Sequence, residues 1–270
     1  MQPEGRFSTT EKSVGNSFDG DAEKSFGSSF DGESRHQTTI YFCNKKISAN
    51  DRMSANNWKR LNPDYEMQLY DDDMIKSFLL KEFGTLYVDV FEYLVDGPIK
   101  ADFFRVCILY KNGGIYSDID ILPLVALSEF IVPGVDFVTC SSFGRLSFNP
   151  NFILSKKGNV VLKRCIDWFV QKYHNQDKYK YWDWSIMNAF TKNLHLPNYT
   201  RESGVYYADE MMIQILKDCP GQGHYDAHST YNKIRVFNNR QPSWDAKFHT
   251  FKDGMVTVKV HCESSVKSPY

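Results

Sequence analysis

Two aspartates separated by one residue, Asp118 and Asp120, are the part of this sequence best suited to chemistry. They follow a short β-rich run, and alternate residues at a strand end project to the same side. Carboxylate oxygens on a compact loop suit hard cations such as Mg²⁺ and Mn²⁺, which complete their coordination with phosphate oxygens and water. Such an ion stabilises the charge that builds up on a departing phosphate. Taken alone the pair is weak evidence, because solvated acidic pairs are common where loops begin.

A second polar pair precedes the aspartates on a segment that predicts a helix. Gly-Pro at 97–98 marks the start of this helix, with proline at a favoured first position, and Gly-Gly at 113–114 marks its end. Asp102 and Arg105 lie three residues apart and therefore share one face. Arginine binds phosphate or sugar oxygens in a bidentate manner, and a carboxylate accepts hydrogen bonds from hydroxyl groups. The alternative is a helical ion pair that contributes little.

The elements that must position these groups alternate between strand and helix. Strands are predicted over 39–43 and 65–70, each followed by a helix, and the helix that carries Asp102 leads into a strand over 115–117. This order favours an α/β fold with a mostly parallel sheet. Further strands are expected over 136–140, 152–154, 233–237 and 255–260, and helices over 50–61, 71–83, 159–174, 181–194 and 208–218.

The first 37 residues differ in composition from the rest of the chain. They contain a near-duplicate, residues 11–22 and 23–34, which is rich in Ser, Gly and charged residues. Such a segment buries too little apolar surface to offset the entropy lost on ordering it. We therefore expect a disordered tail over 1–37 and one folded domain over 38–270. A docking tail that uses its phenylalanines is the alternative.

Bulk properties exclude several classes of protein. Lys and Arg total 32 and Asp and Glu total 33, so the net charge is −1, and the basic surface of a nucleic-acid-binding protein is not expected. No apolar run reaches the roughly 18 residues of a membrane span, and the N-terminus lacks the apolar core of a secretory signal. These features favour a cytoplasmic protein. The six cysteines are spaced singly and are expected to be buried free thiols.

The ordered combination of motifs is more specific than any one of them. It reads Ala101-Asp102-x-x-Arg105-x-x-x-Leu109-Tyr110-x-x-Gly113-Gly114-Ile115-Tyr116-x-Asp118-x-Asp120. This pattern closely resembles the signature of the DXD-type sugar transferases of glycosyltransferase family 32. The segment Asn62-Pro63-Asp64-Tyr65-Glu66 resembles a further motif of that family, and the resemblance covers about residues 38–160. It implies a single-domain GT-A type nucleotide-sugar transferase fold, with a Rossmann-like, mostly parallel sheet flanked by helices.

The resemblance also implies a reaction and a site. The reaction is metal-dependent transfer, with retention of configuration, from a UDP- or GDP-sugar to a glycan or protein-linked hydroxyl acceptor. Asp118 and Asp120 would hold Mn²⁺ or Mg²⁺, with Asp118 also contacting ribose and sugar. Asp102 and Arg105 would grip the donor sugar and the diphosphate. The residues expected around the nucleotide are Tyr41, Phe42, Cys43, Asn44 and Tyr116.

Three residues further along the chain receive roles from the same resemblance. Asn151 would border the donor and the acceptor, with a plain turn residue as the alternative. His261 and Ser264 lie in a C-terminal segment that returns to the metal and the diphosphate in the family, so His261 would be a third metal ligand unless it is structural. Val266 stands where the family usually has tryptophan.

Two rival functions remain at this stage. The departure at Val266 favours a catalytically weak or inactive nucleotide-sugar-binding or carbohydrate-binding protein of the same fold. A nucleotidyltransferase also uses carboxylate pairs with metals, but the third in-sheet carboxylate and the Gly-Ser phosphate-binding element that it requires are not found in the sequence.

The aromatic-rich stretch over 173–184 allows two interpretations. Its rings could form a wall against which an acceptor sugar stacks, or they could pack into the core. The residues concerned include Tyr179, Tyr181, Trp182 and Trp184.

Overall fold

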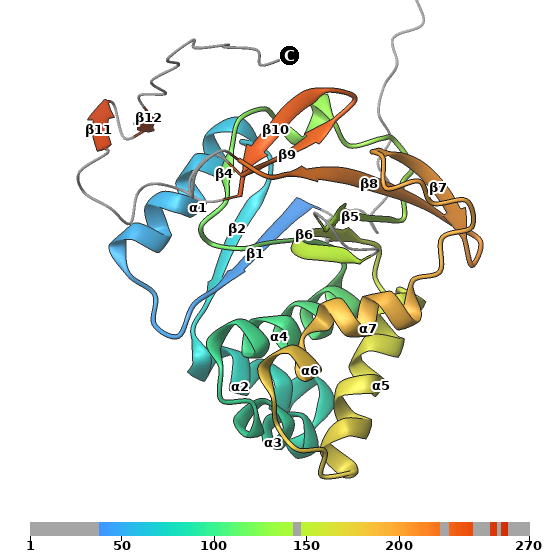
Figure 1. Cartoon of the computed structure of the whole chain (residues 1–270). Helices are drawn as coiled ribbons and strands as arrows, with labels where there is room; N and C mark the ends of the chain where they lie inside the picture. Colours follow the sequence, from blue (N-terminus) through green and yellow to red (C-terminus); the bar gives the residue numbers. More distant parts are fainter. Residues whose placement is uncertain (1–37, 143–146, 222–226, 240–248, 253–254, 259–270) are drawn as a thin grey trace, which may run out of the picture. The chain divides into compact units, whose positions relative to one another are not determined.

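The computed structural model describes residues 38–142, 147–221, 227–239, 249–252 and 255–258 (Figure 1). All of them belong to one compact unit, Glu33–Tyr270. The expected tail over 1–37 and the C-terminal residues His261, Ser264 and Val266 lie outside the described residues, so the roles assigned to them stay predictions.

The first part of the fold alternates strands and helices, and its three strands pair in parallel with the first of them in the centre. In chain order its elements are β1 (Thr39–Cys43), α1 (Ala49–Leu61), β2 (Glu66–Tyr70), α2 (Asp72–Phe83), α3 (Thr85–Tyr93), α4 (Gly97–Asn112) and β3 (Gly114–Ser117). Strand β1 pairs in parallel with both β2 and β3. All five of its residues are buried, as expected for a strand covered on both faces.

The second part of the fold extends the sheet with mostly antiparallel strands. Its elements are β4 (Leu122–Pro123), a 3₁₀ turn (Leu127–Glu129), β5 (Phe137–Ser141), β6 (Phe148–Ser155), α5 (Val160–His174), α6 (Tyr181–Trp184), α7 (Ile186–Asn193), β7 (Gly204–Ala208), β8 (Met211–Cys219), β9 (His228–Tyr231) and β10 (Ile234–Asn238). The strands β11 (His249–Lys252) and β12 (Met255–Val258) form a separate two-stranded sheet.

The described strands of the main sheet are mixed in direction. Their order is β2-β1-β3-β6-β5-β8-β9-β10-β4, with β7 beside β8. The α/β class predicted from the sequence is confirmed. The expected parallel pairing holds for β1 with β2 and β3 and for β5 with β8, whereas the other described pairs of this sheet are antiparallel.

Two helix predictions are wrong in detail. Residues 208–218 were expected to form a helix, but Met211–Cys219 is the strand β8. Its residues 213–216 are buried on both faces, although Gln214 is polar, and so short a buried run does not distinguish a strand from a helix by its period. The helix expected over 181–194 is divided at Ser185, which ends α6 and caps α7. The short helix α3 was not predicted.

The core lies on both faces of the sheet, and β1 contributes to each face. Tyr41 and Cys43 pack in a cluster with α2 to α5 and α7, while Ile40 and Phe42 pack in a second cluster with α1. The described cysteines are free, and four of the five are buried, as expected. Among the described residues, no helix combines the length and the apolar character needed to cross a membrane.

Candidate functional site

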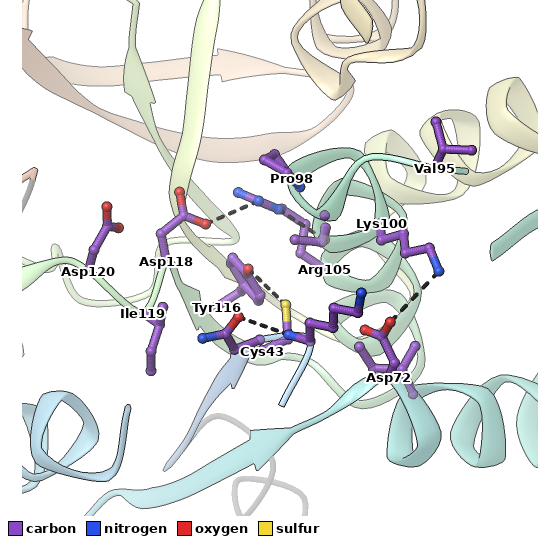
Figure 2. Close-up of a pocket in the computed structure, with 15 residues that line it drawn as sticks. Cys43, Asp72, Val95, Pro98, Lys100, Arg105, Tyr116, Asp118, Ile119 and Asp120 are labelled. Carbon is purple, nitrogen blue, oxygen red and sulfur yellow. Dashed lines mark hydrogen bonds and ion pairs between the residues drawn. The ribbon is translucent and has the colours of Figure 1, made fainter. Parts of the chain in front are cut away.

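A cavity of about 460 Å³ lies at the carboxyl ends of β1, β2 and β3, against the start of α4 (Figure 2). Ligand sites of open α/β sheets occur at this edge, because the loops that follow parallel strands meet there. Residues that line the cavity include Cys43, Asn44, Lys45, Asp72, Lys100, Arg105, Tyr116, Asp118 and Asp120. The predicted aspartate pair and Arg105 are thus brought to one place.

A tight turn after α4 delivers the two aspartates to the cavity. Gly113 and Gly114 have φ angles of 72° and 101°, in the region that favours glycine. A Cβ on Gly113 would lie 2.9 Å from the backbone nitrogen of Lys157. The chain therefore needs glycine here to reverse from α4 into β3.

The loop that carries the aspartates is held by two neighbouring elements. The backbone N–H of Asp118 donates to the carbonyl oxygen of Asn151 in β6 at 2.8 Å. The hydroxyl of Ser54 in α1 donates to the carbonyl oxygen of Ile119. These bonds fix the loop backbone at Asp118 and Ile119, so the two carboxylates project from a rigid support.

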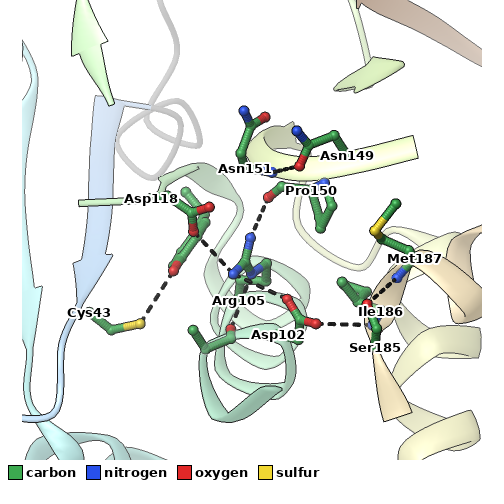
Figure 3. A network of polar contacts seen from close by, with 12 residues as sticks. Cys43, Asp102, Arg105, Asp118, Asn149, Pro150, Asn151, Ser185, Ile186 and Met187 are labelled. Atoms are coloured by element: carbon green, nitrogen blue, oxygen red, sulfur yellow. Dashed lines mark hydrogen bonds and ion pairs between the residues drawn. The ribbon is translucent and has the colours of Figure 1, made fainter. Parts of the chain in front are cut away.

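Arg105 pairs with two carboxylates at once. Its Nη2 lies 3.1 Å from an Oδ1 of Asp102 and 3.1 Å from an Oδ1 of Asp118 (Figure 3). The Arg105 side chain is only 4% exposed, whereas that of Asp118 is 33% exposed. Burial raises the pKa of Asp118, and the charge of Arg105 opposes that rise. The charge of the buried Arg105 therefore favours the ionised form of Asp118 at the cavity surface.

The remaining contacts of Arg105 leave the guanidinium little freedom. Nη1 donates to the carbonyl oxygen of Pro150, and Nε donates to that of Ala101 at 3.2 Å. The guanidinium carbon also lies 4.4 Å from the centre of the Tyr116 ring. A planar fork that is filled in this way is held in one orientation. In this structure Arg105 positions Asp118 as well as lining the cavity.

Asp102 faces the protein interior. It pairs with Arg105 through one oxygen and accepts the backbone N–H of Ile186 through the other, at 3.0 Å. Burial, opposed by Arg105, raises the pKa of Asp102 to about 6. Asp102 is absent from the cavity lining, unlike Arg105. The predicted pair is therefore confirmed as a pair on one helix face, while the structure gives Asp102 a positioning role between α4 and α7.

The residues expected around the nucleotide divide into two groups. Cys43 and Asn44 line the cavity, whereas Tyr41 and Phe42 are buried in the core and do not. Tyr116 lines the cavity and lies 3.3 Å from the Cys43 sulfur through its hydroxyl. Position along β1 explains the division, because only the end of the strand, at Cys43 and Asn44, reaches the cavity.

Sequence reasoning missed three charged residues of the lining: Lys45, Asp72 and Lys100. Lys100 Nζ lies 3.7 Å from Asp72 Oδ2 across the cavity wall. Lys45 directly follows the predicted nucleotide segment, and Asp72 follows the end of the parallel strand β2. For Lys45 and Asp72, the place after a parallel strand was the available signal, since such positions share one sheet edge. Lys100 lies in α4 and had no such signal.

The described residues fit part of a site for a hard cation. Asp118 and Asp120 supply carboxylate oxygens at the cavity, and the buried Oδ1 of Asn151 has no hydrogen-bond partner. Figure 3 shows Asn151 beside Asp118. The described part of the chain holds no cluster of three or more His, Cys, Asp or Glu residues able to hold a metal. An ion with this donor set would need oxygens from a phosphate as well.

The match to a known family covers the segment that builds this cavity. Residues 48–135 match the model of the glycosyltransferase sugar-binding region containing a DXD motif. Asp102, Arg105, Asp118 and Asp120 all fall within the match. The predicted resemblance to the DXD sugar transferases of family 32 is confirmed, and residues 48–135 are similar to a DXD sugar-binding region.

Individual relatives carry related names. The initiation-specific alpha-1,6-mannosyltransferase of Schizosaccharomyces pombe is 35% identical over 78 residues, which are 27% of this chain and 20% of that protein. An uncharacterized glycosyltransferase of Acanthamoeba polyphaga mimivirus is 30% identical over 93 residues, 34% of this chain and 37% of that protein. The chain thus spans well under half the length of these curated relatives. Among solved structures, PaToxG glycosyltransferase is 18% identical with a TM-score of 0.46, over 60% of this chain and 73% of that chain.

Proposed function

We propose that this chain is a glycosyltransferase of the GT-A type, which moves a sugar from a nucleotide diphosphate sugar to a hydroxyl group of a glycan or protein-linked acceptor. The observation that carries the proposal is the placement of Asp118 and Asp120 at the carboxyl edge of the parallel strands, beside the buried Arg105. The family match to a DXD sugar-binding region supports the same reading.

The donor would lie across the cavity from β1 to β3. Its volume of about 460 Å³ falls within the roughly 300–1,000 Å³ of small-molecule sites. The base would lie near Cys43 and Asn44, and the diphosphate near Asp118 and Asp120. Lys45 and Lys100 add positive charge to a lining that otherwise carries several carboxylates, and positive charge favours a diphosphate.

Asp118 and Asp120 are the residues that would hold Mn²⁺ or Mg²⁺, with Asn151 Oδ1 as a neighbouring acceptor and His261 as the further ligand implied by the resemblance. The ion would supply Lewis-acid stabilisation of the leaving diphosphate. The protein's own contribution is orientation. Arg105 fixes one oxygen of Asp118, and the Asp118 side chain stays partly exposed in the cavity lining.

Retention of configuration would follow a front-face route. Two carboxylates of the lining are engaged by cations: Asp118 by Arg105 and Asp72 by Lys100. Such paired groups are weakened as nucleophiles, so the departing phosphate itself would accept the proton of the acceptor hydroxyl. Detection by mass spectrometry of a covalent glycosyl adduct on a side chain would contradict this route.

An inactive nucleotide-sugar-binding protein is the second candidate. The specific observation in its favour is the commitment of Arg105, whose Nε, Nη1 and Nη2 all bond to protein groups. An arginine held in this way has little capacity left for phosphate. Both candidates bind a donor, and turnover separates them.

The test combines binding and turnover. The melting temperature is measured with UDP-glucose, UDP-galactose and GDP-mannose, each with and without Mn²⁺, because a ligand that binds the native state raises it. GDP-mannose is the first choice, since named relatives are mannosyltransferases. Release of nucleoside diphosphate then reports turnover. A transferase shows a metal-dependent thermal shift and release, the inactive protein shows the shift alone, and absence of both contradicts the proposal.

A further inference from the structure

We propose that Tyr181 and Trp182 on α6 form the acceptor subsite, an aromatic surface at the rim of the donor cavity that stacks against the ring of a neutral hexose. This inference rests on the transferase function proposed above and names the part of the site that receives the acceptor.

The aromatic stretch before α7 separates into buried and exposed rings. Trp184 is fully buried, and Tyr179 packs against the core. Trp182 is 63% exposed and Tyr181 is 37% exposed, with their ring centres 5.0 Å apart and nearly perpendicular. Among the tryptophans of the described residues, Trp182 alone is exposed. Large aromatic side chains normally bury their surface, and those that do not are frequent at binding surfaces.

A contact before α6 attaches this segment to the cavity wall. The hydroxyl of Tyr179 donates to Oδ2 of Asp96 at 2.7 Å. Asp96 lies between Val95 and Gly97, and both of these residues line the donor cavity. The chain entering α6 is therefore fixed beside the turn between α3 and α4.

A second contact attaches the segment after α6. The N–H of Ile186 donates to Asp102, which pairs with Arg105 (Figure 3). Tyr181 and Trp182 lie between these two attachments in the chain, so α6 is held next to the start of α4. Burial and the charges of Asp102 and Asp96 raise the pKa of Tyr181, and the charge of Arg105, a residue of the cavity lining, opposes that rise. Tyr181 therefore lies within electrostatic reach of the cavity.

The polar groups around the rings indicate the chemical class of the ligand. Asp183 and Lys180 flank the aromatic pair, with Nζ and Oδ2 3.6 Å apart and both side chains more than half exposed. A pyranose ring presents an apolar C–H face and a rim of hydroxyl groups. The aromatic rings suit the C–H face, while the carboxylate of Asp183 and the ammonium of Lys180 can bind the hydroxyl groups. A lipid chain would gain nothing from these charges, so the surface favours a hexose.

The experiment compares Trp182→Ala, Trp182→Phe and Tyr207→Ala in the full chain. Tyr207 on β7 is a matched control, because it is an aromatic residue that is 69% exposed outside the cavity lining. With GDP-mannose as donor, methyl α-mannopyranoside and methyl β-galactopyranoside serve as acceptor probes. Trp182→Ala is expected to raise the acceptor KM about tenfold, from the size of aromatic contributions, while the donor KM changes less than twofold. Trp182→Phe keeps a ring and stays within about threefold.

The outcomes separate the subsite from the function. Equal acceptor KM values in Trp182→Ala and Tyr207→Ala, with donor hydrolysis intact, would overturn the subsite alone. If the wild-type chain neither binds nor hydrolyses a donor, the proposed function fails, and saturation-transfer NMR of the same methyl glycosides decides the subsite: loss of transfer in Trp182→Ala but not in Tyr207→Ala supports it, and equal transfer contradicts it. Competition by an unglycosylated peptide, but not by the glycosides, would also contradict it.

Discussion

The buried carboxylate of Asp102 and the partly buried carboxylate of Asp218 differ in what stabilises them. Asp102 is paired with the charge of Arg105 and a backbone N–H. Asp218 accepts hydrogen bonds from the neutral side-chain amides of Asn149 and Asn239. Burial raises the pKa of both groups. The charged network therefore lies beside the cavity where we propose that a ligand binds, and the neutral network lies between strands of the sheet.

Three consecutive residues of β6 connect the two networks. Asn149 bonds to Asp218, the carbonyl of Pro150 accepts from Arg105, and the carbonyl of Asn151 accepts from the N–H of Asp118. A disturbance of one network can thus reach the other through a short stretch of backbone. The charged residues of the proposed donor site thus come from the first half of the fold, while the backbone of β6 in the second half holds them in place.

The largest expected effect comes from Arg105→Ala. Removing the cation leaves Asp102 and Asp118 without their partner, and breaking a buried ion pair costs about 3–5 kcal/mol of stability. Chemical denaturation measures this loss, and donor hydrolysis should fall at least about 100-fold, as on loss of one preorganised group. The matched control is Arg164→Ala, which removes an exposed pair with Asp209 worth about 1 kcal/mol or less. Equal losses in the two variants would contradict the network.

Asp102→Asn should have an intermediate effect that depends on pH. The pKa of Asp102 in the folded chain is raised to about 6, so the folded state binds the proton more tightly than the unfolded state does. The stability that this group contributes is therefore full at low pH and is lost as pH rises toward and through about 6. Denaturation of both proteins between pH 4 and pH 7 should show that this slope is missing in the variant. A slope equal to that of the wild type would contradict the assignment.

Asp218→Asn should have the smallest effect, because its partners are neutral. The variant loses one acceptor and keeps the shape of the side chain, so about 1 kcal/mol of stability is expected to be lost. The KM for the donor should change little, since Asp218 is absent from the cavity lining. A clear rise in the donor KM would contradict this ranking, because it would show that residues 149–151 carry a disturbance from one network to the other.

The parts of the site that depend on local spacing could be predicted from the sequence. Asp102 and Arg105 share a helix face because they lie three residues apart, and the glycine pair at 113–114 predicts the turn that delivers Asp118. The first strands and helices also follow from local patterns. These features depend on neighbouring residues, for which sequence reasoning has direct signals.

The parts that depend on distant pairing could not be predicted. The carbonyl of Pro150 reaches Arg105 only because β6 pairs antiparallel with β3, and Ile186 reaches Asp102 only through the packing of α7. Backbone groups carry no residue type, so the sequence holds no signal for these contacts. A helix was expected in place of the strand β8 because the buried residues 213–216 show neither the helical period of about 3.6 residues nor the strand period of two. The burial of Tyr41 and Phe42 could not be predicted either, because it depends on the elements that pack on the two faces of β1.

The central claim is that Asp118 and Asp120 form a metal-dependent donor site, and Asp120→Asn tests it most directly. Donor hydrolysis is measured against Mn²⁺ concentration for the wild type and the variant, with folding checked by the melting temperature. Because Asp120 is only half-buried, we expect the variant to melt near the wild-type temperature. We also expect it to lose most of its rate of donor hydrolysis and to need a much higher Mn²⁺ concentration for the activity that remains. A variant with the wild-type rate and the wild-type Mn²⁺ dependence would contradict the assignment of the site.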